Sequence, residues 1–189
     1  MNQVNQDSIN FLLAWRHSLY PQTKEEIGRF RHMVGERAVM RRCSSVNDVL
    51  LTPAYARLFN KLGEKDASVA RWRNNDERNH QRLGVVVGLL ANLKEHESKL
   101  ESLPKQMGRP ASAESKVALV NESRFQRILR CGDDEFDRLF EQIRRLLPLL
   151  SHKANAYQLI KDLLAWGDPT RQRWARDYYS IAPNPITEN

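Results

Sequence analysis

Apolar residues recur along this chain at intervals of three and four, which is the spacing of one face of an α-helix. The strict alternation of apolar and polar residues that marks a half-buried strand is nearly absent. The one clear run of β-branched residues, Val85–Val87, lies inside a longer apolar segment from Leu83 to Leu93. The sequence therefore predicts an all-α protein.

Capping residues mark the starts of several predicted helices. Ser45 and Asp48 have the spacing of a capping box, in which each side chain bonds the backbone N–H of the other residue. Other predicted starts are Ser8, Thr52 with Pro53 at the first helical position, Asn155, and Asp168 with Pro169. Between these helices, the polar stretch from Glu64 to Asp76 predicts a loop.

The segment "LPKQMGRPASA", residues 103–113, is the best candidate for a domain boundary, because two prolines and a glycine fall in a short polar run. We therefore predict two small helical-bundle domains. The N-terminal domain covers residues 1–103, a linker covers 104–113, and the C-terminal domain covers 114–182. Residues 183–189 are predicted to form a flexible tail.

The chain of 189 residues has 30 lysines and arginines against 23 aspartates and glutamates, a formal net charge of +7. This excess favours binding to polyanions, which include nucleic acid, an anionic membrane and an acidic protein. Cys43 and Cys131 lie far apart and form no CxxC pair, so neither a disulfide framework nor a zinc site is indicated. With no signal peptide or membrane span in the sequence, we expect a cytoplasmic protein without a membrane partner.

Motifs of the common enzyme classes are missing from the sequence. It contains no glycine-rich phosphate loop, no GxSxG and no HExxH. Glu77 and His80 form one ExxH, but a di-iron helical bundle needs two such motifs. We therefore predict a protein that is not an enzyme, with no catalytic residues, no metal and no cofactor.

Three arginines, Arg37, Arg41 and Arg42, lie within the six residues "RAVMRR", which include no acidic side chain. In a helix, Arg37 and Arg41 share a face one turn apart, where like charges repel. Helix stability therefore does not explain the cluster. Guanidinium groups bind phosphate oxygens in a bidentate manner, so the cluster indicates contact with a nucleic-acid backbone.

Two further arginine groups extend this interpretation. In "SRFQRILR", Arg124, Arg127 and Arg130 lie on one helical face, opposite an apolar face. The other group consists of Arg71, Arg73, Arg78 and Arg82, with Trp72 as a candidate for base stacking. Because residues 121–147 hold six arginines and six carboxylates, some of this charge could be paired internally. No recognition helix is evident, so we predict binding without sequence specificity.

Seven segments in this order resemble the CasB family, the small subunit of the type I-E CRISPR surveillance complex called Cascade. They are "AWR", "RAVMRR", "TPAYARLF", "WRNNDERNHQRLG", "MGRP", "NESRFQRILRCGDDEFDRLFEQIRRLLPLL" and "LIKDLLAWGDPTRQRWARDYY". The resemblance runs from Trp15 to Tyr179. Each motif consists mostly of arginine and leucine at helical spacing, and their shared order makes the match specific.

The resemblance implies two helical bundles, no catalytic activity, and a pair of such subunits in a complex with the large subunit and the backbone subunits. It also implies contact with the guide RNA, the target strand and the displaced DNA strand. The residues matched by position are Arg41, Arg42, Arg78, Arg109 of the "GR" pair, Arg124 and Arg130, with Arg37 and Arg127 as additional candidates. Pro110, the long stretch from Ser112 to Val120 and the long Glu64–Asp76 stretch depart from the family pattern.

Three other classes of protein fit parts of the same pattern. A helical adaptor would dock its basic face on an acidic protein partner. A stand-alone helical DNA-binding regulator would prefer one duplex sequence, whereas a Cascade subunit would show little preference. A helical-bundle metalloenzyme comes last, because its second ExxH motif is missing.

Overall fold

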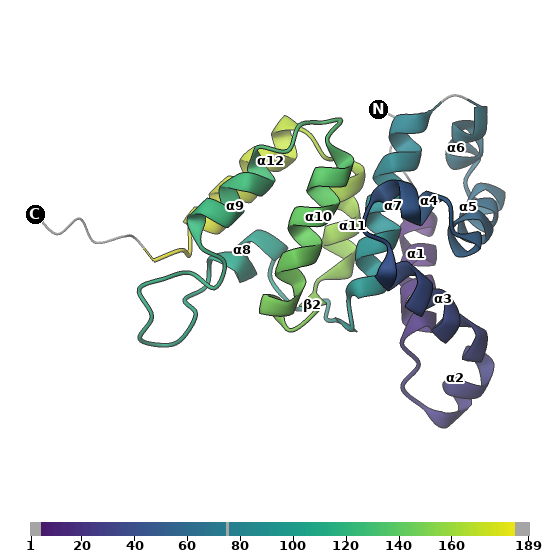
Figure 1. Ribbon diagram of the computed structural model, residues 1–189, viewed down its shortest axis with the longest axis horizontal. Coiled ribbons are helices and arrows are strands. Elements are labelled where there is room, and N and C mark those ends of the chain that lie inside the picture. Colours follow the sequence, from purple (N-terminus) through teal and green to yellow (C-terminus); the bar gives the residue numbers. More distant parts are fainter. Residues whose placement is uncertain (1–4, 75, 184–189) are drawn as a thin grey trace, which may run out of the picture.

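The computed structural model of this chain describes residues 5–74 and 76–183, and α-helices dominate that part of the chain (Figure 1). The prediction of an all-α protein is confirmed. The α-helices are α1 (Gln6–Leu19), α2 (Lys24–Arg29), α3 (Arg31–Arg42), α4 (Val46–Leu50), α5 (Pro53–Lys65), α6 (Ala67–Ala70), α7 (Glu77–Asn92), α8 (Leu103–Gly108), α9 (Glu122–Leu129), α10 (Phe136–Leu146), α11 (Ala156–Leu164) and α12 (Asp168–Tyr179). The remaining elements are the 3-10 helices η1 (Arg71–Asn74) and η2 (Leu147–Leu150) and the short strands β1 (Glu95–His96) and β2 (Lys153–Ala154).

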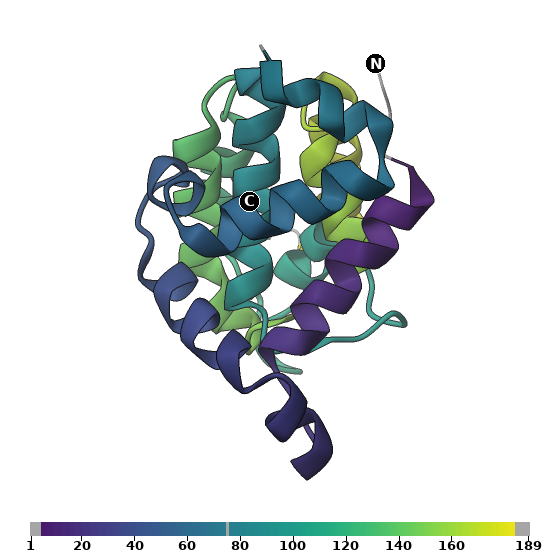
Figure 2. The same ribbon diagram turned by 90° about the vertical axis from the view of Figure 1, so that its right-hand side faces the viewer.

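Helix α7 lies at the centre of this arrangement (Figure 1). Every residue from Leu83 to Asn92 is buried, and α3, α4, α10 and α11 pack against the helix. A helix that is apolar all round can be stable in water only when other elements cover all of its faces. The helices of both halves of the chain therefore depend on α7 for packing. Helix α2, by contrast, buries none of its residues and projects from the body (Figure 2).

Two glycines in α7 allow its neighbours to approach closely. A Cβ atom on Gly84 would lie 2.7 Å from Cγ1 of Val46 in α4. A Cβ atom on Gly88 would lie 2.7 Å from Cε2 of Phe140 in α10 and 3.0 Å from Cγ2 of Val49 in α4. These distances are shorter than van der Waals contact, so a side chain at either position would push α4 or α10 away.

The predicted linker contains a helix. Most of residues 104–113 belong to α8 or follow it directly, and α8 packs against α12. The short parallel pair of β1 and β2 joins Glu95 to Lys153 and His96 to Ala154, which links the two halves of the chain a second time. The division into domains 1–103 and 114–182 stays a prediction. The predicted tail, residues 183–189, lies outside the described residues apart from Pro183.

The prediction of a loop from Glu64 to Asp76 is wrong for most of that stretch, because α5 continues to Lys65 and α6 and η1 follow. Asp66 caps α6 by accepting a hydrogen bond from the Ser68 backbone N–H at 2.9 Å. Trp72 is only 4% exposed, so its interpretation as a base-stacking residue is also wrong. The Trp72 side chain belongs to the core. Its neighbours in the sequence are polar, so nothing in the sequence indicated that it is buried.

The predicted capping residues are largely confirmed. Ser45 and Asp48 form the expected capping box, and the side chains of Thr52 and Asn155 cap α5 and α11. Ser8 does not cap α1, which begins at Gln6 with Asn5 as its cap. Instead, the Ser8 hydroxyl is buried and donates to Oδ2 of Asp66 at 2.7 Å, which ties α1 to the start of α6.

We predict that Gly88→Ala lowers the free energy of unfolding by up to about 2 kcal/mol. Alanine favours helix by up to about 1 kcal/mol, but overpacking against the buried Phe140 ring costs about 1–3 kcal/mol. Urea denaturation measures the difference. The control is Gly35→Ala in α3, where an added Cβ would meet nothing within 4 Å. This control should raise stability by about 0.5–1 kcal/mol, and destabilisation by both changes would contradict the packing argument.

Candidate nucleic-acid interface

Helix α3 presents its three arginines on the side away from the core. Met33 and Met40 are the buried residues of α3, whereas Arg41 and Arg42 are exposed and Arg37 is half-buried. The side chains of Arg41 and Arg42 make no ion pair or hydrogen bond with any described residue. The sequence-predicted cluster is therefore a real surface cluster with two unpaired positive charges.

Arg37 is held in place more firmly than its two neighbours. Its Nη1 atom donates to the Leu19 carbonyl at 3.0 Å, and its guanidinium carbon lies 4.7 Å from the centre of the Tyr20 ring. Tyr20 is fixed in turn by a hydrogen bond from its hydroxyl to the Ala91 carbonyl at 2.6 Å. Burial raises the pKa of Tyr20, although the charges of Arg41 and Arg37 act in the opposite direction. Tyr20 thus stays a neutral donor that supports Arg37.

Helix α10 brings two more arginines to the α3 cluster. Arg144 donates a hydrogen bond to the Cys43 carbonyl at the end of α3, and Arg145 forms an ion pair with Glu141 at 2.6 Å. Together the two helices form a cavity of about 590 Å³, which we call the α3–α10 groove. Its lining residues are Val34, Arg37, Ala38, Arg41, Arg42, Asn92, Arg144, Arg145, Pro148 and His152. Among the described residues, five arginines and no carboxylate line this groove.

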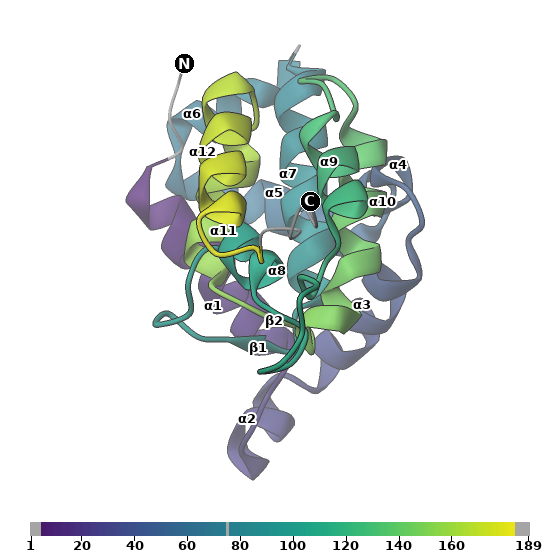
Figure 3. The ribbon, with the colours of Figure 1, turned by 90° about the vertical axis from the view of Figure 1, so that its left-hand side faces the viewer.

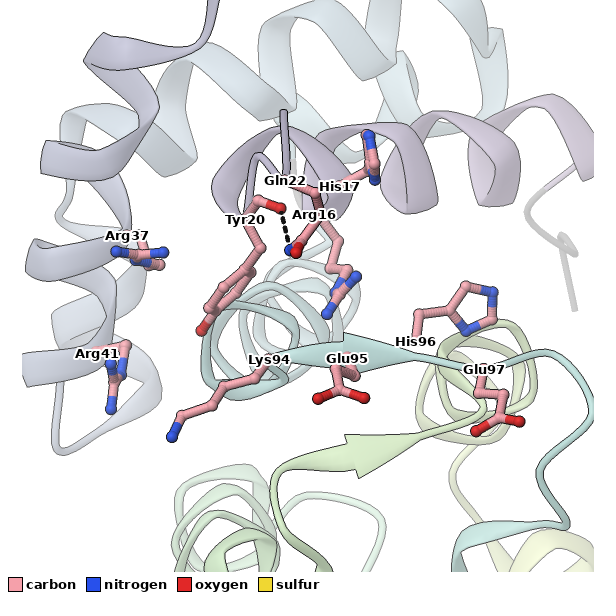
Figure 4. A pocket seen from close by; sticks show the side chains of 10 residues that line it. All are labelled: Arg16, His17, Tyr20, Gln22, Arg37, Arg41, Lys94, Glu95, His96 and Glu97. Atoms are coloured by element: carbon pink, nitrogen blue, oxygen red, sulfur yellow. Dashed lines mark hydrogen bonds between the residues drawn. The ribbon is translucent and has the colours of Figure 1, made fainter. Parts of the chain in front are cut away.

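A second cavity lies on the other side of Arg37 and Arg41, between α3, the end of α1 and β1 (Figure 4). Its volume is about 740 Å³, and we call it the Arg16 cavity. The residues that line it are Arg16, His17, Tyr20, Gln22, Arg37, Arg41, Lys94, Glu95, His96 and Glu97. Because Arg37 and Arg41 line both cavities, the basic surface passes over α3 from one to the other.

The C-terminal end of α7 orients side chains around these cavities. The last carbonyls of a helix have no partner within the helix. Here the Ala91 carbonyl accepts from Tyr20, the Leu93 carbonyl accepts from Arg16, and the Asn92 carbonyl lies 3.0 Å from Nδ1 of His152. Positive charge is favoured at this end of a helix. Helix α7 therefore orients side chains of the candidate site in addition to forming the centre of the core.

The three arginines of the second predicted group form a separate basic surface. Arg124, Arg127 and Arg130 are exposed on α9 or directly after it, while Phe125 and Ile128 of the same helix are buried. None of the three arginine side chains forms an ion pair with a described residue. Helix α10 lies between α9 and α3, so this surface is set apart from the α3–α10 groove (Figure 1). In Figure 3, which faces this side of the molecule, α9 lies near the viewer and α3 is drawn fainter, farther away.

The other two predicted residues are paired with carboxylates. Arg78 stands at the start of α7, the end opposite the groove, where its Nη2 atom lies 3.5 Å from Oδ2 of Asp133. Arg109 follows α8, and its Nη2 atom lies 2.9 Å from Oε2 of Glu101. Both pairs are exposed, and such pairs are worth about 1 kcal/mol or less. The structure therefore does not bring Arg78 or Arg109 to the groove.

Sequence reasoning missed Arg144 and Arg16 as members of the basic surface. The pair "RR" at 144–145 follows an apolar helical pattern and gives a hint of an arginine face. Nothing in the sequence shows that this pair meets the end of α3, which lies about a hundred residues earlier. Arg16 lies in an apolar segment, where no pattern distinguishes it from an ordinary surface arginine.

The described part of the chain offers neither a cluster of metal ligands nor a membrane span. Within it, no group of three or more histidine, cysteine, aspartate or glutamate side chains could hold a metal ion. His80 of the ExxH motif is half-buried, with Nδ1 at 2.9 Å from the Tyr55 hydroxyl. No described helix combines the length and the apolar character that crossing a membrane requires.

The fold and the site define a class of protein: an all-α protein with an arginine-lined groove that is suited to binding phosphates. Comparison with known families makes the assignment specific. The model of the family described as CRISPR-associated protein Cse2 matches residues 36–179, so the chain belongs to this family. It is thus a subunit of the type I-E CRISPR complex Cascade and a partner of the other Cascade subunits. No curated protein matches the chain.

We predict that the adjacent substitutions Arg144→Ala and Arg145→Ala differ in their effect on stability. Arg144→Ala removes the donor to the Cys43 carbonyl and should lower the free energy of unfolding by about 1–2 kcal/mol. Arg145→Ala removes only an exposed ion pair and should cost less than about 0.5 kcal/mol. Urea denaturation of both variants measures this difference, and equal effects would show that Arg144 does not hold α10 to α3.

Proposed function

We propose that this chain binds nucleic-acid backbones without sequence specificity through the α3–α10 groove. Within Cascade, the bound strands are the displaced DNA strand and the guide RNA paired with its target strand. The chain thereby stabilises the R-loop during antiviral defence. In this role it is not an enzyme, uses no cofactor, and acts in the cytoplasm with a second copy of itself beside the large and backbone subunits.

The observation that carries the proposal is the meeting of arginines from two distant segments in one groove. Five guanidinium groups line it without a described carboxylate, and those of Arg41 and Arg42 have no partner among the described residues, whereas Arg145 is paired with Glu141 outside the lining. Like charges gathered in this way repel one another, and a bound polyanion would relieve the repulsion. The planar guanidinium group can donate two hydrogen bonds to one phosphate group, so arginine suits the backbone of a nucleic acid.

The remaining lining of the groove supports binding to the backbone rather than reading of bases. Val34, Ala38 and Pro148 offer only apolar surface, and the Asn92 side chain already donates to the Gly88 carbonyl at 2.8 Å. Side-chain amides of asparagine and glutamine are common readers of adenine, so an engaged Asn92 is poorly suited to that task. In RNA-guided recognition, base pairing reads the sequence and the protein holds the strands.

The α9 surface is proposed as a second phosphate contact on the same molecule. Arg124, Arg127 and Arg130 are exposed and unpaired among the described residues, and α10 lies between α9 and α3 (Figure 1). A strand bound in the groove would cross α10 to reach them. Arg78 and Arg109 remain in the proposed set, but each must first leave its carboxylate partner, so we expect smaller contributions from them.

We predict that the double substitution Arg41→Glu, Arg42→Glu weakens binding of single-stranded DNA at least about tenfold near 0.1 M salt, because it removes two phosphate-binding groups and adds repulsion. The slope of log affinity against log salt should fall by about 0.7 for each phosphate that is no longer neutralised on a single strand. Fluorescence anisotropy with labelled DNA and RNA of several sequences, across a salt series, measures both quantities.

The matched control carries the same change of charge at exposed lysines away from the groove, Lys61→Glu with Lys99→Glu. It should keep most of the affinity and the original salt slope. If both double variants lose affinity equally, net charge alone governs binding and the groove assignment fails. A strong preference for one duplex sequence would instead favour a sequence-reading DNA-binding protein.

A further inference from the structure

His152 lines the α3–α10 groove with its ring held in one orientation. Its Nδ1 atom lies 3.0 Å from the Asn92 carbonyl at the C-terminal end of α7. A carbonyl oxygen only accepts hydrogen bonds, so Nδ1 must carry the hydrogen, and the neutral ring has its lone pair on Nε2. Nε2 has no hydrogen-bond partner in the described part of the chain and stays accessible to solvent. One ring nitrogen is thus anchored to the core, and the other is free.

The backbone of His152 is fixed as firmly as its ring. Its N–H donates to the Leu147 carbonyl at 2.8 Å, and its own carbonyl accepts from the Lys94 N–H at 3.0 Å. Ser151 and His152 both have positive φ angles, 54° and 57°, which residues other than glycine seldom adopt. Conformations of this kind gather at sites where the surrounding structure holds a residue for binding. The fixed ring of His152 is therefore a candidate for contact with a ligand.

In the described elements around this ring, cations outnumber carboxylates. The arginines that share the groove with it are Arg37, Arg41, Arg42, Arg144 and Arg145, and the neighbouring β1 and β2 segments add Lys94 and Lys153. Two carboxylates of the same elements, Glu95 of β1 and Glu141 of α10, are paired with Lys153 at 2.7 Å and with Arg145 at 2.6 Å. The cations repel a protonated imidazole, whereas the phosphates of a strand bound among them attract one. A bound strand would therefore favour protonation of His152.

We propose that His152 is a sixth phosphate-binding side chain of the α3–α10 groove and that it binds only when protonated. In the neutral ring, Nε2 offers a lone pair, which cannot bond a phosphate oxygen. A proton taken from solvent makes Nε2 a donor and gives the ring a positive charge, while Nδ1 keeps its bond to the Asn92 carbonyl. Histidine ordinarily titrates near pH 6.5, so the groove should hold a strand more tightly below neutral pH. This role rests on the proposed function, since the phosphate belongs to the strand in the groove.

The test is fluorescence anisotropy of the full chain with labelled single-stranded DNA, at about pH 8 and at about pH 6. We expect the wild-type chain to gain about three- to tenfold more affinity at the lower pH than His152→Asn does, because the variant lacks the charged donor. The slope of log affinity against log salt should also steepen by up to about 0.7 for the wild type and stay constant for the variant. At about pH 8 the two proteins should bind equally.

Asparagine is the matched replacement for His152. Its side-chain amide can donate to the Asn92 carbonyl from nearly the position of Nδ1, and asparagine tolerates a positive φ angle. Urea denaturation at both pH values confirms that the variant is folded. The control is His32→Asn, at an exposed position of α3 outside the groove lining, which should keep the full pH dependence of the wild type. Equal pH dependence in the wild type and His152→Asn would overturn the proposal, as would an equal loss in both histidine variants.

Nitrogen NMR of the imidazole rings tests the starting geometry independently. At about pH 8, the signals that disappear in His152→Asn should be those of a neutral ring with its hydrogen on Nδ1. A hydrogen on Nε2 would overturn the proposal, because the neutral ring would already be a donor.

The double variant Arg41→Glu, Arg42→Glu separates this role from the groove itself. If it leaves DNA affinity unchanged at both pH values, the groove assignment fails, and the role of His152 fails with it. If it weakens DNA binding while His152→Asn matches the wild type at both pH values, the groove stands and only the role of His152 fails.

Discussion

The close packing of α4 and α10 on α7, at Gly84 and Gly88, is the constraint on which the rest of the structure depends. Because α10 packs directly against α7, the C-terminal end of α10 reaches the end of α3, where Arg144 donates a hydrogen bond to the Cys43 carbonyl. The C-terminal end of the same core helix also supplies the carbonyls that anchor Arg16 and Tyr20. Packing deep in the core thus determines where positive charge gathers at the surface.

Much of the fold was predictable because its signals are local. Helical spacing of apolar residues, the capping box of Ser45 and Asp48, and the Thr52–Pro53 start depend only on residues a few positions apart. The cluster of Arg37, Arg41 and Arg42 was predictable for the same reason, since one helical turn brings its members together. Family membership then gave these arginines a context that charge alone does not supply.

The features that the sequence did not reveal depend on contacts between distant segments. Trp72 lies in a polar stretch, and its burial follows only from the way α6 and η1 fold over the core. Arg16 has an apolar local sequence, and its role follows from the Leu93 carbonyl at the far end of α7. The ion pairs of Arg78 and Arg109 likewise join different elements, so sequence analysis counted both arginines as free charge.

The central claim is that α3 and α10 form one phosphate-binding groove. The most direct test measures the salt dependence of single-stranded DNA binding for two variants separately, Arg42→Gln and Arg145→Gln. The two residues lie about a hundred positions apart in sequence but line the same groove. Arg42→Gln should reduce the slope of log affinity against log salt by about 0.7, the value for one phosphate contact on a single strand. Arg145→Gln should reduce it by a smaller amount, because Arg145 must first leave its ion pair with Glu141. A reduced slope for Arg42→Gln with an unchanged slope for Arg145→Gln would contradict the account, because α10 would then take no part in holding the strand.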